Sequence, residues 1–208
     1  MDKEKVLKKF GKEDYQVNEN TYIMGIHHLL GEHIAQRFKG YNTVLEVCTG
    51  AGFMLIPLAR NARKIITVEI NPEHLEQAKN NIKISGIKSD INFLLGDILN
   101  NKILNKITNI DAAVLDPDWS EIGKQKLIHA PKFSVMQPAA DKLFDEINKK
   151  TQNIAIRLPK EIDLAELKKL PSCELEKIYL DNEFKFYCAY FGKLAKKMGN
   201  TEFKTFTV

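Results

Sequence analysis

The sequence predicts an α/β fold, built on a doubly wound sheet of mostly parallel strands. Short apolar runs alternate with helical stretches through residues 43–158, and two β-rich runs follow close together within residues 175–191. Alternating strands and helices indicate βαβ units with parallel strands, whereas two runs joined by a tight turn indicate an antiparallel hairpin. Counting five runs of the first kind and two of the second, we expect a seven-stranded sheet that ends in a hairpin.

The predicted strands are rich in β-branched and aliphatic residues and are separated by turn residues. The expected parallel strands cover residues 44–47, 65–70, 91–95, 112–115 and 154–158. The expected hairpin pairs residues 175–180 with residues 184–191 through the turn residues Asp181, Asn182 and Glu183. The helix after the second strand is clearly marked, because Pro72 suits a first helical turn and Gly86 suits a helix end.

Residues 1–40 predict an N-terminal helical segment that packs across the sheet. Its apolar residues recur at spacings of three and four, and they are Ile23, Ile26, Leu29, Leu30 and Ile34. Because the sequence shows no repeat, linker or low-complexity tract, we expect residues 1–208 to form one domain, with residues 41–208 as its core.

The composition is that of an ordinary globular domain, with 208 residues of which 44% are hydrophobic and 28% charged. No run approaches the roughly 18 consecutive apolar residues of a membrane helix, and the lysine-rich start does not resemble a signal peptide. We therefore expect a cytoplasmic protein that does not contact membranes. The three cysteines, Cys48, Cys173 and Cys188, lack ligand spacing, so no metal site is expected. The net charge of +4 is compatible with a polyanionic partner but does not identify one.

A glycine-bearing turn follows the first predicted strand and leads into an apolar helix, within residues 44–53. Glycine suits such a turn, because its backbone adopts conformations that other residues resist and approaches a ligand closely. Nicotinamide dinucleotides and S-adenosylmethionine both bind at turns of this kind, and a plain tight turn also fits. The candidate cofactor-binding residues in this stretch are Glu46, Cys48, Thr49, Gly50 and Gly52.

Two further predicted strand ends carry carboxylates. Glu69 lies roughly twenty residues beyond the turn, where a carboxylate accepts hydrogen bonds from both ribose hydroxyls of a nucleotide cofactor. Asp97 follows the next strand, directly after Gly96. Such an order of strand ends favours a nucleoside cofactor over ordinary strand caps. The neighbouring residues that we assign to the same site are Ile70, Asn71 and Ile98.

The fourth predicted strand ends in Asp116, Pro117, Asp118 and Trp119. This stretch resembles the (Asn/Asp/Ser)-Pro-Pro-(Tyr/Phe/Trp) signature of methyltransferases that modify amine or amide nitrogens. An acceptor side chain and a rigid carbonyl can bind the hydrogens of a planar amine and orient it, which assigns these roles to Asp116 and the Pro117 carbonyl. Trp119 would stack on a base, an interaction of about 1–3 kcal/mol. Asp118 replaces the second proline, and its carboxylate offers a further acceptor.

Together these stretches resemble one family, the RNA cap guanine-N2 methyltransferases, which are trimethylguanosine synthase-like. The resemblance rests on residues 46–52, 69–72, 96–97 and 116–119, on the Leu-Pro-Lys of residues 158–160, and on residues 33–35 and 189–192. It implies a class I S-adenosylmethionine-dependent methyltransferase with a Rossmann-like sheet, in which Asp97 binds the adenine amino group. A parallel sheet that ends in a hairpin agrees with this class, since nicotinamide dehydrogenase domains keep their last strand parallel.

The resemblance implies S-adenosylmethionine as cofactor, RNA as substrate and the exocyclic N2 amine of guanine as methyl acceptor. Two alternatives stay open. The same loop serves methyltransferases acting on another nitrogen, in a different base or a protein amide. The variant positions Cys48 and Asp118 also fit a catalytically silent protein that binds RNA or S-adenosylmethionine. The sequence does not predict an oligomeric state.

Overall fold

The computed structural model describes residues 1–120 and 131–207. The chain divides into two compact units, Met1–Asp111 and Ala112–Val208, and each is described by itself. Within the described residues, no helix is both long enough and apolar enough to cross a membrane.

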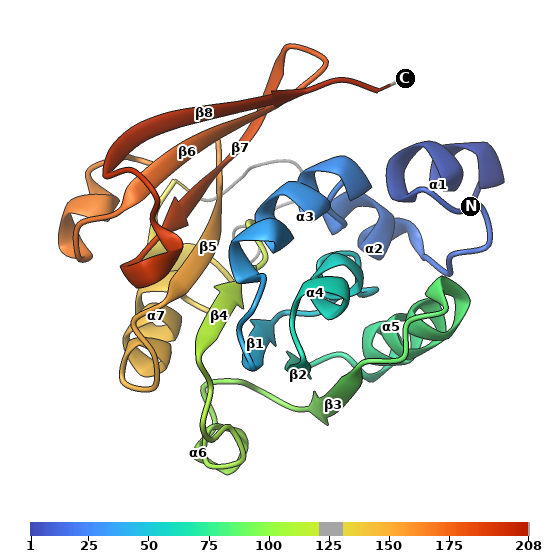
Figure 1. Cartoon of the computed structure of the whole chain (residues 1–208), viewed down its shortest axis with the longest axis horizontal. Coiled ribbons are helices and arrows are strands. Elements are labelled where there is room, and N and C mark those ends of the chain that lie inside the picture. The colour runs from blue at the N-terminus through green and yellow to red at the C-terminus, as the bar shows by residue number, and fades with distance from the viewer. Residues whose placement is uncertain (121–130, 208) are drawn as a thin grey trace. The chain divides into compact units, whose positions relative to one another are not determined.

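The first unit contains three parallel strands in the order β3, β2, β1 (Figure 1). They are β1 (Thr43–Val47), β2 (Lys64–Glu69) and β3 (Asp90–Leu95). The register pairs Val47 with Val68 and Glu69 with Leu95, so all three strands end at the same edge. β1 and β2 are buried beyond their first residues, which explains why the sequence shows them as continuous apolar runs.

Two helices connect these strands, α4 (Leu55–Asn61) and α5 (Pro72–Ser85), and they pack against β2 and against each other. The predicted limits of α5 are confirmed. The Asn71 side chain accepts a hydrogen bond from the Glu73 amide (2.9 Å), and Gly86 ends the helix with φ 75°. The short helix α6 (Asn101–Leu104) follows β3.

The N-terminal segment is helical, as predicted, but it is broken into several pieces. These are α1 (Lys3–Phe10), α2 (Glu19–Met24), α3 (His28–Ala35) and the 3₁₀ turn η1 (Gln36–Phe38). Gly11 ends α1 with φ 84°, a left-handed conformation that a continuous helix excludes. The expected apolar stripe is buried at Ile26, Leu30 and Ile34, whereas Ile23 is 52% exposed because it lies on a different helix. α3 packs against α4.

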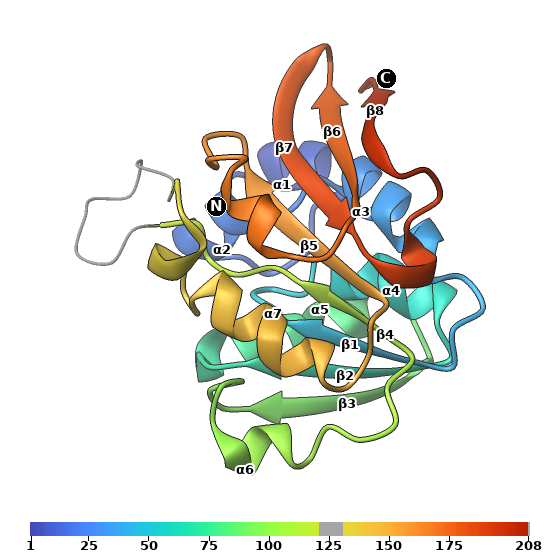
Figure 2. The same cartoon turned by 90° about the vertical axis from the view of Figure 1, so that its left-hand side faces the viewer.

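The second unit contains five strands in the order β4, β5, β7, β6, β8. They are β4 (Ala112–Leu115), β5 (Ile154–Pro159), β6 (Glu174–Leu180), β7 (Glu183–Tyr190) and β8 (Gly199–Thr205). β4 and β5 are parallel, β7 is antiparallel to both β5 and β6, and β8 is parallel to β6. The remaining elements are η2 (Phe133–Val135), α7 (Ala140–Asn148), η3 (Glu166–Lys169) and η4 (Gly192–Leu194). α7 lies along β4 (Figure 2).

The predicted fold class is confirmed: the strands are mostly parallel, and β6 and β7 form the predicted antiparallel hairpin, with β8 beside β6 at the edge. The hairpin turn is confirmed at Asp181 and Asn182, which take φ 53° and 63° as tight hairpin turns require. Glu183, also predicted as a turn residue, is the first residue of β7. The predicted count of seven strands is wrong, since the described residues contain eight. β8 escaped prediction because it is an edge strand with exposed and half-exposed residues in alternation, and Phe203 is its single large apolar residue.

A buried carboxylate, Glu174 at the start of β6, joins this eighth strand to the unit. It is 2% exposed and accepts hydrogen bonds from the backbone amides of Lys196 (2.6 Å) and Lys197 (3.2 Å). The Thr201 hydroxyl on β8 donates to its other oxygen (3.0 Å). Glu174 thus binds both the segment that connects η4 to β8 and the strand β8.

We predict that Glu174→Ala lowers the free energy of unfolding by about 1–3 kcal/mol, because three donors lose their acceptor. Urea denaturation measures this difference. The matched control is Glu202→Ala, whose side chain on β8 is 50% exposed, and its effect should stay within about 0.5 kcal/mol. Equal losses in the two variants would contradict the role assigned to Glu174.

Candidate functional site

The turn after β1 adopts the backbone conformations that its sequence predicts. Gly50 and Gly52 have φ 54° and 84°. A Cβ atom at Gly52 would lie 3.2 Å from the Ala78 Cβ on α5, so the turn packs closely on that helix. At Gly50 no atom lies within 4 Å of the corresponding position, which leaves open space beside the turn. Cys48 has φ 67° and therefore takes a left-handed conformation at a position where related turns carry glycine.

Glu69, at the carboxyl end of β2, holds this turn through its side chain. One carboxylate oxygen accepts a hydrogen bond from the Gly50 amide (2.8 Å) and the other accepts one from the Asn71 amide (2.9 Å). The residue is 6% exposed. Each carboxylate oxygen has more than one lone pair, so these contacts orient Glu69 without exhausting its capacity to accept hydrogen bonds.

Glu46 faces the interior of the unit, where it belongs to a chain of polar side chains between β1 and β2. It is fully buried, and the Thr67 hydroxyl donates to its carboxylate. Thr67 also shares a hydrogen bond with the Thr49 hydroxyl, which lies 3.2 Å from the Val68 carbonyl. This chain ties the turn to β2. Glu46 and Thr49 therefore support the backbone of the turn, and Thr67 is a member of the group that sequence reasoning missed.

The remaining predicted cofactor residues form the rim at the ends of β2 and β3. The Gly96 amide donates to the Glu69 carbonyl (2.9 Å), which joins the two strand ends. Asp97 is exposed and accepts a hydrogen bond from the Leu99 amide (2.9 Å), whereas Ile98 is buried. Ile70 is 67% exposed and Leu95 is 52% exposed, so two apolar side chains face solvent beside Glu69.

Asn81 is a further residue of this region that sequence reasoning missed. Its side-chain amide donates to the Ala51 carbonyl (2.9 Å), between the two glycines of the turn, and to the Gln16 carbonyl (2.9 Å). Its oxygen accepts from the Gln16 amide (2.7 Å). A sequence signal existed, because Asn81 lies on the buried face of α5 next to Ile82, where an amide needs partners.

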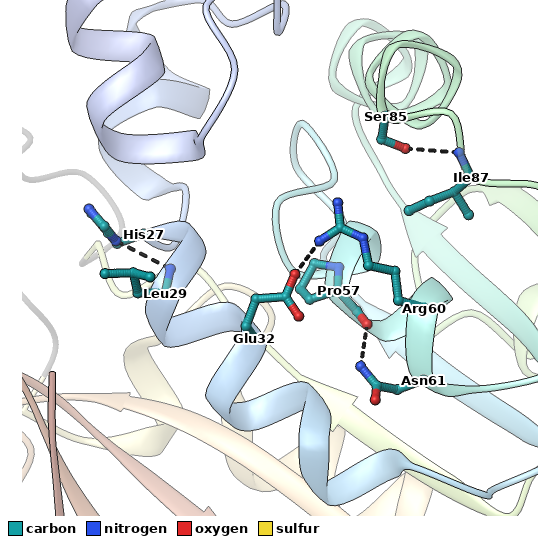
Figure 3. Close-up of polar contacts among 8 residues, drawn as sticks. All are labelled: His27, Leu29, Glu32, Pro57, Arg60, Asn61, Ser85 and Ile87. Carbon is teal, nitrogen blue, oxygen red and sulfur yellow. Dashed lines mark hydrogen bonds and ion pairs between the residues drawn. The ribbon is translucent and has the colours of Figure 1, made fainter. Parts of the chain in front are cut away.

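A pocket of about 250 Å³ lies elsewhere in the first unit, and none of the predicted site residues lines it. Phe10 and Phe53, whose ring centroids are 3.5 Å apart, line it together with Tyr15 and His28. Burial raises the pKa of the Tyr15 phenol and lowers the pKa of the His28 imidazole. Figure 3 shows the ion pair between Glu32 on α3 and Arg60 on α4, both of which also line the pocket.

In the second unit the predicted catalytic loop directly follows β4. Asp116, Asp118 and Trp119 are partly exposed, and Pro117 is buried. The Asp118 amide donates to the Gln137 carbonyl (2.8 Å), and the Asp118 carbonyl accepts from the Gln137 amide (3.0 Å). A proline at this position, as in the Pro-Pro signature, would lack the first of these bonds. The Asp118 side chain accepts from the Ser120 amide (2.8 Å).

Arg157 on β5 contacts both ends of this loop and was not predicted as a site residue. Its guanidinium forms an ion pair with Asp116 and lies 4.9 Å from the centroid of the Trp119 ring and 4.6 Å from that of Phe186. The Trp119 indole N–H donates to the Arg157 carbonyl (3.3 Å). Burial raises the pKa of the Asp116 carboxyl, and Arg157 opposes this rise.

The second unit thus presents carboxylate acceptors beside an aromatic ring at a strand end, as recognition of an amine requires. The first unit presents a glycine turn and a bound carboxylate, which suit a ribose-bearing cofactor. Within residues 1–120 and 131–207, no cluster of three or more His, Cys, Asp or Glu side chains fits a metal ion.

Comparison with known proteins places these features in a family. A family model described as RNA cap guanine-N2 methyltransferase matches residues 41–194. The chain is 29% identical to trimethylguanosine synthase of Schizosaccharomyces pombe over 168 residues, which cover 74% of this chain and 69% of that protein. It is 28% identical over 115 residues to an uncharacterised RNA methyltransferase of Synechocystis, covering 52% of this chain and 24% of that protein.

Among solved structures, the fold is similar to that of a Porphyromonas gingivalis protein described as a methyltransferase. The TM-score is 0.76 at 19% identity, and the match covers 94% of this chain and 49% of that one. The chain therefore spans about half of that structure, and the matches to uncharacterised RNA methyltransferases of Synechocystis, Parasynechococcus and Nostoc cover 24%, 16% and 17% of those proteins. From the family model that matches residues 41–194, this chain belongs to the RNA cap guanine-N2 methyltransferases.

Proposed function

We propose that this chain transfers a methyl group from S-adenosylmethionine to the exocyclic N2 amine of guanine in RNA. The observation that carries the proposal is the loop after β4, where two partly exposed carboxylates, Asp116 and Asp118, precede the partly exposed ring of Trp119. Membership of the guanine-N2 methyltransferase family and the likeness to a trimethylguanosine synthase support this substrate.

In this proposal the first unit binds the cofactor. Glu69 is already oriented by two backbone amides and accepts hydrogen bonds from the ribose hydroxyls through its remaining lone pairs. The open space at Gly50 accommodates the methionine portion, and exposed Ile70 contacts the adenine ring. Asp97 accepts from the adenine amino group. The cofactor supplies an electrophilic methyl group on a sulfonium ion.

The second unit binds the guanine. The Watson–Crick edge of guanine presents N1–H and N2–H donors, which the carboxylates of Asp116 and Asp118 and the carbonyl of Pro117 accept. The adenine edge presents a ring-nitrogen acceptor at the N1 position, which a carboxylate repels. Acceptors that bind the amine hydrogens orient the nitrogen and favour the charge that develops during methyl transfer. Trp119 stacks on the base.

We further propose that RNA reaches the protein in the cytoplasm and that residues 1–208 act as one domain. The exposed lysines near the C-terminus, Lys193, Lys196 and Lys197, suit contacts with RNA phosphates.

A second candidate function is silent binding of RNA or S-adenosylmethionine. The observation that favours it is Asp118 itself, which stands where the signature of active nitrogen methyltransferases has a second proline. Turnover of labelled cofactor separates the two functions.

We predict that Glu69→Gln weakens S-adenosylmethionine binding by about 2 kcal/mol, or about 30-fold, because charged hydrogen bonds to the ribose are lost. Isothermal titration calorimetry measures the change. The matched control is Glu76→Gln, whose side chain is 59% exposed on α5, and it should bind like the parent protein. Unchanged affinity in the Glu69 variant, or tight NAD binding without S-adenosylmethionine binding, refutes the cofactor assignment.

We predict that Asp118→Asn lowers kcat/KM for guanine in RNA by about tenfold to a hundredfold, since one carboxylate acceptor becomes a mixed donor and acceptor. Asparagine keeps both backbone bonds to Gln137, whereas proline would lose the one that the amide donates. The assay incubates protein with labelled cofactor and total RNA and then analyses the nucleosides. Asp145→Asn, an exposed change on α7, is the control. Equal turnover in both variants, or labelling of protein alone, refutes the guanine assignment.

We predict that Trp119→Ala raises KM for RNA by about tenfold or more and changes kcat less, because stacking contributes about 1–3 kcal/mol per base. Trp119→Phe keeps a stacking ring and loses the indole bond to Arg157, so its KM should rise less. A loss confined to kcat in the alanine variant would contradict stacking on the substrate.

A further inference from the structure

Arg157 is a buried cation in the middle of an apolar strand. It is 4% exposed, and its neighbours on β5, Ile156 and Leu158, are fully buried. A buried charge is costly unless it is paired, and Asp116 supplies that pairing. Within residues 1–120 and 131–207 the Arg157 Nε atom has no hydrogen-bond partner. An apolar side chain would suit this position in β5 better, so the packing of the strand does not account for arginine.

The contacts of Arg157 do account for it, because they join the two chemical parts of the loop. The guanidinium reaches the Asp116 carboxylate through Nη1 and lies near the Trp119 ring, 4.9 Å from its centroid. The guanidinium carbon also lies 4.6 Å from the centroid of the Phe186 ring on β7. The centroids of the Trp119 and Phe186 rings are 6.0 Å apart. The Arg157 carbonyl accepts from the Trp119 indole.

We propose that Arg157 is a positioning residue for the methyl transfer, one that fixes the Asp116 carboxylate and the Trp119 ring before the guanine binds. This inference rests on the proposed function. Arg157 does not touch the base: it acts through Asp116, the acceptor, and through Trp119, the stacking surface. Preorganised acceptors need no rearrangement during the reaction, so the ion pair acts on rate as well as binding.

The charge of Arg157 also influences the protonation of Asp116, because it opposes the rise in pKa that burial causes. In the part of the chain that the structure describes, the charged groups that act on Asp116 are Arg157 on β5 and Asp118 in the same loop. Burial and Asp118 raise the pKa of Asp116, and Arg157 lowers it. Removing Arg157 therefore raises this pKa further. The ionised, accepting form of Asp116 is then lost as the pH falls through a higher value than in the parent protein.

The test uses the single tryptophan of the chain, Trp119, as a reporter. Its fluorescence is followed during a pH titration of the full chain, in the parent protein, Arg157→Gln and Arg157→Gln with Asp116→Asn. We expect an acid transition that moves to higher pH in Arg157→Gln and disappears in the double variant. Arg63→Gln, which removes an exposed arginine, should leave the transition where it was. An unmoved transition in Arg157→Gln overturns the proposal.

The same variants are assayed for methyl transfer to guanine in RNA across pH. In Arg157→Gln we expect the acid limb of kcat/KM to shift to higher pH and KM for RNA to rise about fivefold to tenfold, as loss of a cation–π contact implies. Arg157→Lys keeps the charge and should keep the acid limb. A uniform loss at every pH, with an unshifted limb, marks a merely structural residue and overturns the proposal.

The fluorescence titration keeps this inference separate from the proposed function. If the parent protein methylates no guanine, the proposed function fails, and the Trp119 transition still tests whether Arg157 controls Asp116. Arg157→Gln leaves the largely buried carboxylate of Asp116, 17% exposed, without its pair and can unfold the unit, so the double variant, which removes both charges, serves as the folded reference.

Discussion

Parallel pairing of strands places their carboxyl ends at one edge, and the candidate site depends on this constraint. In the first unit, β1, β2 and β3 are joined by α4 and α5, which return the chain to the starting edge of the sheet each time. The glycine turn, Glu69 and Asp97 follow those three strands in order. In the second unit, β4 is parallel to β5 and the Asp116 loop follows it directly. Ligands of such sheets bind at these strand ends, where the loops that follow the strands provide the side chains that contact the ligand.

Buried polar side chains hold these loops in the conformations that binding requires. Glu69 accepts hydrogen bonds from the Gly50 and Asn71 amides, and the Asn81 side chain donates to the Ala51 carbonyl in the middle of the glycine turn. These bonds are made within the folded chain, so the turn does not have to be ordered when a ligand arrives. Because a buried polar group without a partner is destabilising by about 1–3 kcal/mol, each of these side chains also restricts the alternatives open to the loop.

In the second unit an ion pair, rather than hydrogen bonds from backbone amides, holds the loop after β4. Asp116 and Asp118 place two carboxylates in one short loop, and Arg157 forms an ion pair with Asp116. A neutral first residue, which the signature of nitrogen methyltransferases also allows, would need no such cation. The ion pair therefore links the aspartate at position 116 to the arginine at position 157. The guanidinium has a further use here, since its flat face can lie against Trp119 while its edge binds the carboxylate.

The sequence by itself determined the strand order along the chain, the fold class and the strand ends that carry glycine or carboxylate. These properties depend on residues that are close in sequence. They include hydrophobic periodicity, turn residues and the residues that begin and end α5, Asn71 and Gly86. It also placed the hairpin turn correctly at Asp181 and Asn182. The family resemblance read from residues 46–52, 96–97 and 116–119 agrees with the family model that matches residues 41–194.

Only the tertiary structure decided which side chains lie beside the predicted ones. Arg157 is separated from Asp116 by 41 residues and Asn81 from Ala51 by 30, and no local pattern encodes contacts across such distances. The same holds for β8, whose pairing with β6 depends on backbone hydrogen bonds and on buried Glu174 rather than on an apolar run. Hydrophobic patterning specifies which face of an element is buried, but the partner of a buried charge is set by where distant strands meet.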